Sequence, residues 1–331
     1  MLKLSRLLVV LLVAVSAYAQ VDSLSDADKH AVAEANKFVE RGNQFVQKQS
    51  LPRAKAEYEK ALKIFPRHLD ALYNLAIVCE RLGNSDEAIE HYRHYVELKP
   101  DDADVWTQLG LLYDEAGKKT DAVAAYQKAI ASNPKFGRAF HNLGVLMKEQ
   151  GRNDEAEKDF KQFVKLEEEA GRQPSEGYYS LGILYLERGR AKDANMLLQK
   201  ALDADPNVPA YNNALGDVYL VEHEPQLAIE SYNKALEKDP KHAPAYSGLG
   251  DAYAQLGDRD KAATSYRKAL ELRSDYGVVH FKLGKLYENT DPGQAIKQFE
   301  DYLNSGKNLQ YADEAKATVA TLKLTQPATK P

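Results

Sequence analysis

His91 and His94 come closest, by residue type and spacing, to a site that could do chemistry. They lie three residues apart in a segment expected to be helical, with Glu87 and Glu90 just before them. Imidazole and carboxylate groups on one helix face are ligands that Zn²⁺ takes in proteins. The sequence specifies no third ligand, and we expect this helix to face outward or into a stack of helices. We therefore predict no metal site, and we keep an enzyme or metal carrier built on this pair as a third hypothesis.

Neither the single cysteine nor the glycine-rich segment adds a catalytic function. Cys79 stands where equivalent segments carry Phe, Tyr or Met, so we expect a buried apolar thiol, and one cysteine cannot form an internal disulfide. Gly248 and Gly250 lack the preceding strand and the third glycine of a dinucleotide-binding loop. We therefore predict that the chain is not an enzyme and needs no cofactor.

The element that must position all of these residues is a helical hairpin, clearest in residues 103–134. Apolar side chains recur with helical spacing in both of its halves. Gly117 can end the first helix in a left-handed conformation, and Pro134 closes the second because proline cannot continue a helix. The apolar and small positions of the hairpin are Trp106, Leu109, Gly110, Leu112, Tyr113, Ala122, Ala125, Tyr126, Ala129 and Ile130.

The hairpin recurs along most of the chain. With Ala103 as position 1, the small residue of position 8 recurs at steps of 34 residues, except for one step of 38. These small residues are Gly42, Ala76, Gly110, Gly144, Gly182, Gly216, Gly250 and Gly284. Position 24 is held by Tyr58, Tyr92, Tyr126, Phe160, Leu198, Tyr232, Tyr266 and Phe299. A single hairpin cannot bury both of its faces, so these units must stack on one another.

This pattern resembles the tetratricopeptide repeat, a 34-residue helix–turn–helix unit. The resemblance implies an all-α protein: a right-handed α-solenoid, or superhelix, of eight repeats followed by a C-terminal capping helix. The step of 38 reflects four extra residues near Glu167–Pro174, which we expect to lengthen the preceding helix. This insertion is either a hinge between two four-repeat halves or a tolerated surface insertion.

We expect the chain to be organised around these repeats. Ser25 followed by Asp28 predicts a helix start within an N-terminal helical extension, residues 20–34. The repeats are expected at residues 35–68, 69–102, 103–136, 137–174, 175–208, 209–242, 243–276 and 277–306. A capping helix (307–323) and a disordered tail (324–331) are expected to follow.

The first nineteen residues indicate export. Lys3 and Arg6 precede the apolar run Leu7–Val15, and Ala17 and Ala19 form a small-x-small cleavage site. We predict a signal peptide, residues 1–19, that is cleaved after Ala19; an uncleaved N-terminal anchor is the alternative. The mature chain would lie in a bacterial periplasm or be secreted, without membrane insertion. A net charge of −5 argues against a protein that binds duplex nucleic acid through its phosphates.

The resemblance implies that the first helix of each repeat lines a concave wall. Position 9 on that wall is aliphatic in four consecutive repeats, where solvent would favour polar groups. An exposed apolar strip rimmed by charge suits a peptide; the alternative is that these side chains pack against neighbouring first helices. The predicted partner-binding residues are Tyr73, Ile77, Thr107, Leu111, His141, Val145, Tyr179, Ile183 and Leu186.

The sequence thus predicts a non-enzymatic scaffold for protein–protein interaction outside the cytoplasm. Its partner would be a peptide or protein segment bound on the concave face. The alternative is a self-associating structural platform for the assembly of an envelope or secretion complex. Repeat arrays serve unrelated tasks, so the pattern does not identify the partner.

Overall fold

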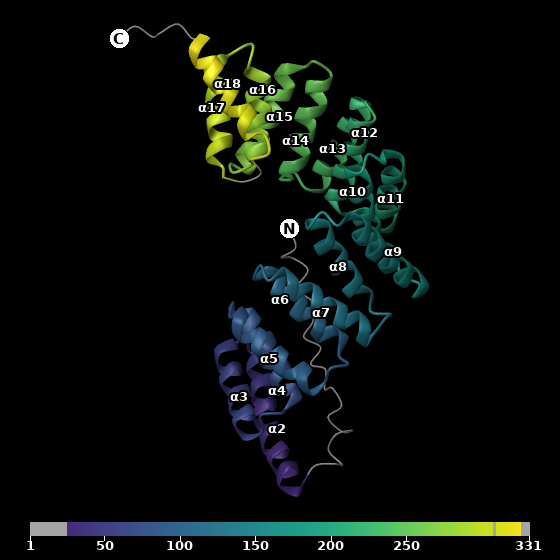
Figure 1. The fold of residues 1–331 in the computed structure, drawn as a ribbon, viewed down its shortest axis with the longest axis vertical. Helices are drawn as coiled ribbons and strands as arrows, with labels where there is room; N and C mark the ends of the chain where they lie inside the picture. The colour runs from purple at the N-terminus through teal and green to yellow at the C-terminus, as the bar shows by residue number, and fades with distance from the viewer. Residues whose placement is uncertain (1–24, 307–308, 326–331) are drawn as a thin grey trace, which may run out of the picture. The chain divides into compact units, whose positions relative to one another are not determined.

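The computed structural model describes residues 25–306 and 309–325, in which every regular element is an α-helix (Figure 1). The predicted signal peptide, and residues 20–24, 307–308 and 326–331 of the segments expected next to the repeats, lie outside this description. The helices are α2 (Asp26–Gln47), α3 (Leu51–Ile64), α4 (Leu69–Leu82), α5 (Ser85–Leu98), α6 (Ala103–Glu115), α7 (Lys119–Ser132), α8 (Gly137–Glu149), α9 (Asn153–Glu169), α10 (Ser175–Glu187), α11 (Ala191–Ala204), α12 (Pro209–Val221), α13 (Pro225–Lys238), α14 (Ala243–Gln255), α15 (Arg259–Leu272), α16 (Gly277–Tyr287), α17 (Pro292–Asn304) and α18 (Ala312–Thr325). The predicted all-α helical-repeat fold is confirmed.

Consecutive helices pack in pairs, and within residues 25–166 and within residues 167–306 successive pairs contact one another (Figure 1). Thus α4 packs on α5, α6 on α7 and α12 on α13, while the second helix of one pair contacts the first helix of the following pair, as α7 contacts α8. No helix among those described is both long and apolar enough to cross a membrane.

The helices belong to two compact units, which meet in the sequence between Leu166 and Glu167. This point lies inside α9, which has 17 residues where α7 and α11 have 14. Three of the four extra residues of the sequence therefore lengthen this helix, as predicted, and Gly171 follows it with φ +72°. The division between the units coincides with the insertion.

Local chemistry explains where the helices begin and end. The side chain of Ser25 accepts a hydrogen bond from the backbone N–H of Asp28, 3.2 Å away, and so caps α2 as its sequence predicts. Asp102 caps α6 in the same way, accepting from the N–H of Val105 at 3.3 Å. Gly117 has φ +73° and turns the chain from α6 into α7, a conformation that costs little only for glycine.

Each pair is held by a side chain of its second helix that lies against the small residue of its first helix. The ring of Tyr126 lies over Gly110, and a Cβ atom on this glycine would be 2.6 Å from ring carbon Cδ1. Phe160 lies over Gly144 in the same way, at 2.8 Å. These rings are 1% exposed, so they form the centre of each hairpin. Glycine at position 8 is what allows the two helices to approach this closely.

Tyr232 differs from the other rings because it contacts the glycines of two successive pairs. It lies against Gly216 of its own pair and against Gly248 of the next, and a Cβ atom on either would overlap the ring. Tyr232 is fully buried. One side chain thus joins α12 and α13 to α14.

The last helix covers the end of the second unit. In α18, Ala315 is fully buried, while Val319 and Leu322 pack against a cluster that includes Phe281. The ring of Tyr311, just before this helix, stacks on Phe281 with centroids 4.5 Å apart. The apolar face that the final pair would otherwise expose is therefore covered, as a solenoid end requires.

We expect Gly110→Ala to destabilise the chain. The added methyl group overlaps the Tyr126 ring, and overpacking of this kind costs about 1–3 kcal/mol, offset in part by about 1 kcal/mol of helix propensity. The free energy of unfolding in urea measures the net loss. Because Tyr126→Leu removes the ring, Gly110→Ala should cost less in that background. An equal cost in both backgrounds would contradict the proposed overlap.

Candidate partner-binding surface

The first helices of the pairs lie on the inner side of each unit. The backbones of α6 and α8 approach each other, and α12 approaches both α10 and α14. The described second helices show no comparable approach of backbones; long side chains span the distance instead, as in the ion pair of Lys55 on α3 with Glu87 on α5. Elements that come closer together lie on the inside of a curve, so the first helices line the inner wall of their unit.

Six of the nine predicted contact residues belong to the first unit. Tyr73, Ile77, Leu111, His141 and Val145 are half-buried on α4, α6 and α8, so each keeps part of its side chain accessible. Thr107 is different: it is fully buried, and its hydroxyl donates a 2.8 Å hydrogen bond to the carbonyl of Ala103. The prediction of Thr107 as a contact residue is therefore corrected, because its side chain is sealed inside the fold.

The other three predicted residues lie on α10 in the second unit. Tyr179, Ile183 and Leu186 are half-buried. The ring of Tyr179 packs against that of Tyr211 on α12, with centroids 5.2 Å apart. Tyr179 thus packs on a neighbouring first helix, while part of its side chain remains accessible.

Polar side chains bridge the inner helices of the first unit. The hydroxyl of Tyr73 on α4 donates to Asp104 on α6 at 3.5 Å, and Arg138 on α8 donates to the other oxygen of Asp104 at 3.2 Å. Burial raises the pKa of Asp104, against the opposing effect of Arg138, and burial raises the pKa of Tyr73 to about 12. Asp104 therefore links three inner helices of the first unit, α4, α6 and α8.

Aromatic packing restricts two of the predicted anchors. The ring of Tyr73 lies 6.0 Å from that of Tyr92 and 5.9 Å from that of Tyr95. The imidazole of His141 lies 5.7 Å from the ring of Phe160 and 4.9 Å from that of Phe163. These residues are held in place by the second helices behind them, so their accessible edges are preorganised.

The structure shows why position 9 alternates between polar and aliphatic residues, which sequence reasoning missed. Where position 24 is a tyrosine, its buried hydroxyl needs an acceptor. Position 9 supplies it three times, with donor–acceptor distances of 2.6–2.8 Å. These hydrogen bonds run from Tyr58 to Asn43, from Tyr232 to Asp217 and from Tyr266 to Asp251.

Where position 24 has no hydroxyl, the residue at position 9 does not need to accept a hydrogen bond. Phe160 accompanies Val145, and Leu198 accompanies Ile183. In the pair that has Ala76 in place of glycine, Tyr92 donates to Glu80 at 2.6 Å, and position 9 is Ile77. Position 9 is therefore aliphatic without loss of an acceptor in these three pairs, whereas Leu111 lies at position 9 of a pair that has Tyr126 at position 24. The sequence alone shows only part of this relation, because Tyr92 and Tyr126 accompany Ile77 and Leu111, and Phe299 accompanies Lys285.

The inner wall of the second unit carries a charged group built on the same bonds. Asp217 accepts hydrogen bonds from Tyr232 at 2.7 Å and from Asn213 at 3.1 Å, and Lys282 pairs with Asp251 at 2.6 Å. Burial raises the pKa of Asp217 to about 6, opposed by the hydrogen bond from Tyr232 and assisted by the charge of Asp251. The carboxyl of Asp217 therefore titrates close to neutral pH.

Comparison with protein families agrees with this architecture. Models described as tetratricopeptide repeat match residues 39–103, 179–243 and 231–263, and a model described as TPR repeat matches residues 250–291. The chain contains tetratricopeptide repeats. A further model, the middle TPR-like domain of cilia and flagella-associated protein 70, matches residues 72–204 of this tetratricopeptide-repeat chain.

Among curated proteins, the tetratricopeptide-repeat chain is similar to the type IV pilus assembly protein PilF of Pseudomonas aeruginosa. The two are 40% identical over 68 residues, which are 20% of this chain and 27% of PilF. The chain thus spans about a quarter of the length of this relative.

Solved structures share the tetratricopeptide-repeat fold. The crystal structure of the APC/C hetero-tetramer Cut9–Hcn1 has a TM-score of 0.62 at 21% identity, over 91% of this chain and 57% of that chain. A tetratricopeptide repeat protein from Parabacteroides merdae ATCC 43184 has a TM-score of 0.62 at 20% identity, over 77% of this chain and 99% of that chain. Both likenesses concern the fold alone.

The raised pKa of Asp217 predicts a stability that depends on pH. The pKa in the folded chain, about 6, exceeds that of an unfolded aspartate, about 3.9, so the folded state binds the proton more tightly. This contribution to stability, on the order of 3 kcal/mol, is complete below pH 4 and is lost as the pH rises through 6. Urea unfolding at pH 4 and pH 7 should show a smaller difference for Asp217→Asn than for the wild type. Asp260→Asn, at an exposed position of α15, is the control; equal pH dependence in Asp217→Asn and the wild type would contradict the assignment.

Proposed function

We propose that this chain is a non-enzymatic scaffold that binds an extended segment of a partner protein on the inner faces of its first helices. Tetratricopeptide-repeat proteins generally mediate protein–protein interaction. The observation that carries the proposal is the row of accessible aliphatic side chains at position 9 of successive first helices: Ile77, Leu111 and Val145. Each of these three side chains is half-buried, so part of it can contact a partner.

The chemistry of the wall indicates the kind of segment it would take. Carboxylates lie beside the aliphatic residues of the first unit: Asp104, bridged to Arg138, and Asp114, paired with Lys119 at 2.5 Å. In the second unit, α10 carries an apolar group of its own: Tyr179, Ile183 and Leu186. A segment with aliphatic or aromatic side chains and interspersed Lys or Arg fits both properties. A few anchors would carry most of the binding energy.

We propose that the repeats number eight and begin at residues 35, 69, 103, 137, 175, 209, 243 and 277. The helix starts support this division, since α4, α6, α8, α10, α12, α14 and α16 begin at the last seven of these residues. The first repeat is joined to the N-terminal extension within one helix, α2, which begins at Asp26.

The second candidate is a self-associating platform for envelope or secretion-complex assembly. The similarity to a type IV pilus assembly protein favours it, although that match covers only 68 residues. Light scattering distinguishes the two: a platform would grow with concentration, whereas a partner-binding scaffold would keep one size.

Export is part of the proposal and rests on the sequence of the first nineteen residues. We expect the mature chain to begin at Gln20, because the signal would be cleaved after Ala19. Fractionation of the source cells followed by mass determination of the intact chain measures this. A chain retaining Met1 in the cytoplasmic fraction would contradict it.

The binding surface is tested by adding charge to the inner wall. We expect Ile77→Asp, Leu111→Asp and Ile183→Asp together to reduce partner capture at least tenfold, because three buried apolar contacts would become desolvated carboxylates. Crosslinking pull-down from the native envelope fraction, with the partner identified by mass spectrometry, measures capture.

The matched control adds the same three charges to second helices. Ala124→Asp and Ala131→Asp on α7 and Met196→Asp on α11 replace exposed residues, of which Met196 is 56% exposed. Circular dichroism and the midpoint of urea unfolding establish that both triple variants fold. Equal capture by the two variants would place the binding surface elsewhere.

A further inference from the structure

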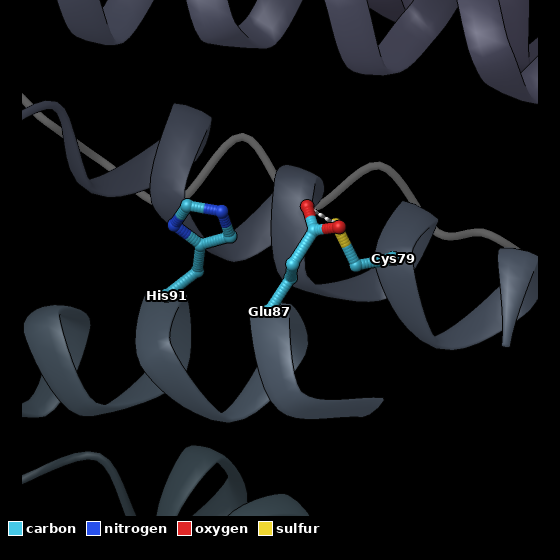
Figure 2. A group of neighbouring side chains, drawn as sticks. All are labelled: Cys79, Glu87 and His91. Carbon is cyan, nitrogen blue, oxygen red and sulfur yellow. Dashed lines mark hydrogen bonds between the residues drawn. The ribbon is translucent and has the colours of Figure 1, made fainter. Parts of the chain in front are cut away.

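Three side chains that can bind a metal converge between α4 and α5, away from the inner wall. They are Cys79, Glu87 and His91, and their potential ligand atoms all lie within 4.8 Å of one another (Figure 2). Cys79 is fully buried, while Glu87 and His91 are half-buried. The thiol thus forms the floor of the cluster, and the carboxylate and imidazole connect it to solvent.

The positions of these residues follow from the helices that carry them. Glu87 and His91 lie four residues apart on α5, so they lie on one face, as their parallel stems in Figure 2 show. Cys79 comes from the last turn of α4 and points at the carboxylate of Glu87. His94, which the sequence suggested as the partner of His91, is not part of the cluster.

Comparison with another pair shows what is particular to this place. Position 11, occupied by Cys79, is Tyr253 in α14, and position 19, occupied by Glu87, is Lys261 in α15. There the ammonium of Lys261 lies 5.4 Å from the centre of the tyrosine ring, a cation–π contact. Between α4 and α5 a small thiol replaces the ring and a carboxylate replaces the ammonium. This exchange places two possible ligands for a cation beside His91.

The carboxylate of Glu87 is already oriented. Asn84 donates to its Oε1 at 3.0 Å, which leaves Oε2 facing the thiol of Cys79, whose sulfur lies 3.7 Å away. Such outer hydrogen bonds fix the ligands of metal sites in proteins. Lys55 also lies 2.5 Å from Oε2, and it can keep an ionic partner if it moves, because Glu59 is 3.8 Å from its ammonium.

We propose that Cys79, Glu87 and His91 bind one Zn²⁺ ion, with water as the fourth ligand. Zn–S and Zn–N distances of about 2.3 and 2.0–2.1 Å place donor atoms about 3.5 Å apart in a tetrahedron, so the cluster closes with shifts of about 1 Å. A thiolate, an imidazole and a carboxylate together suit Zn²⁺ better than Mg²⁺ or Ca²⁺, which prefer oxygen alone. On binding, the S–H bond of Cys79 is replaced by an S–Zn bond and the proton leaves to solvent.

The bound ion would fasten the end of α4 to the middle of α5, and in doing so it would displace the ammonium of Lys55 from Glu87. It does not touch the inner wall, so the proposal stands whether or not the wall binds a partner.

The test uses the full chain without a histidine tag, dialysed against ZnSO₄ and then against metal-free buffer. Atomic emission should find one zinc per chain. We expect Cys79→Ser and His91→Gln to lower the affinity at least tenfold, and His94→Gln, three residues away on the same helix, to leave it unchanged. Lys55→Met should raise the affinity several-fold, because it removes the competing ammonium.

A second readout identifies the sulfur ligand. Co²⁺ bound in place of zinc should give the near-ultraviolet sulfur-to-metal charge-transfer band of a thiolate, and Cys79→Ser should abolish it. Circular dichroism checks that each variant folds. A wild-type chain that retains no zinc and shows no such band overturns the proposal, and so does zinc retained equally by His91→Gln.

Discussion

The contact between a small residue at position 8 and the side chain of position 24 is the constraint on which the rest of this structure depends. It sets the distance between the two helices of a pair, as Gly110 and Tyr126 or Gly144 and Phe160 show. Because the rings are fully buried, any hydroxyl they carry must find an acceptor inside the pair. Where the ring is Tyr58, Tyr232 or Tyr266, the acceptor of its hydroxyl is the residue at position 9 of the inner wall. In these pairs, the packing at the centre of the hairpin therefore also determines a side chain of the inner surface.

This coupling gives the two kinds of inner wall a common origin. Tyr232 and Tyr266 fix Asp217 and Asp251 as acceptors, and the second unit accordingly presents carboxylates and Lys282. Phe160 and Leu198 make no such demand, and Val145 and Ile183 stand there instead. The carboxylates of the second unit thus serve as acceptors for buried hydroxyls, while Val145 and Ile183 lie in pairs that have no such hydroxyl. A substitution at Asp217 or Asp251 would therefore also remove the acceptor of the buried tyrosine hydroxyl behind it.

The fold could be predicted from the sequence because its signals are local and repeated. Gly117 ends a helix and Ser25 begins one through the conformations of single residues, and stacking follows from the apolar stripes. The site was predicted less well because it depends on where side chains point. Thr107 was placed on the surface, but its hydroxyl binds the carbonyl of its own helix four residues back, inside the packed face. Cys79 and His91 come together only when two helices are paired, and spacing along one helix pointed to His94 instead.

The double contact of Tyr232 has a consequence for how the chain comes apart. The free energy of unfolding of a repeat array is the sum of the stabilities of single repeats and of the interfaces between neighbouring repeats. Such an array comes apart first at its weakest interface. Tyr232 contributes both to the stability of its own repeat and to the interface with the next repeat, since the same ring lies against Gly216 and Gly248. The helices α12 to α14 cannot open one pair without exposing the ring that seals the next. They form a cooperative block, and partial unfolding of the second unit should begin on either side of it and stop there.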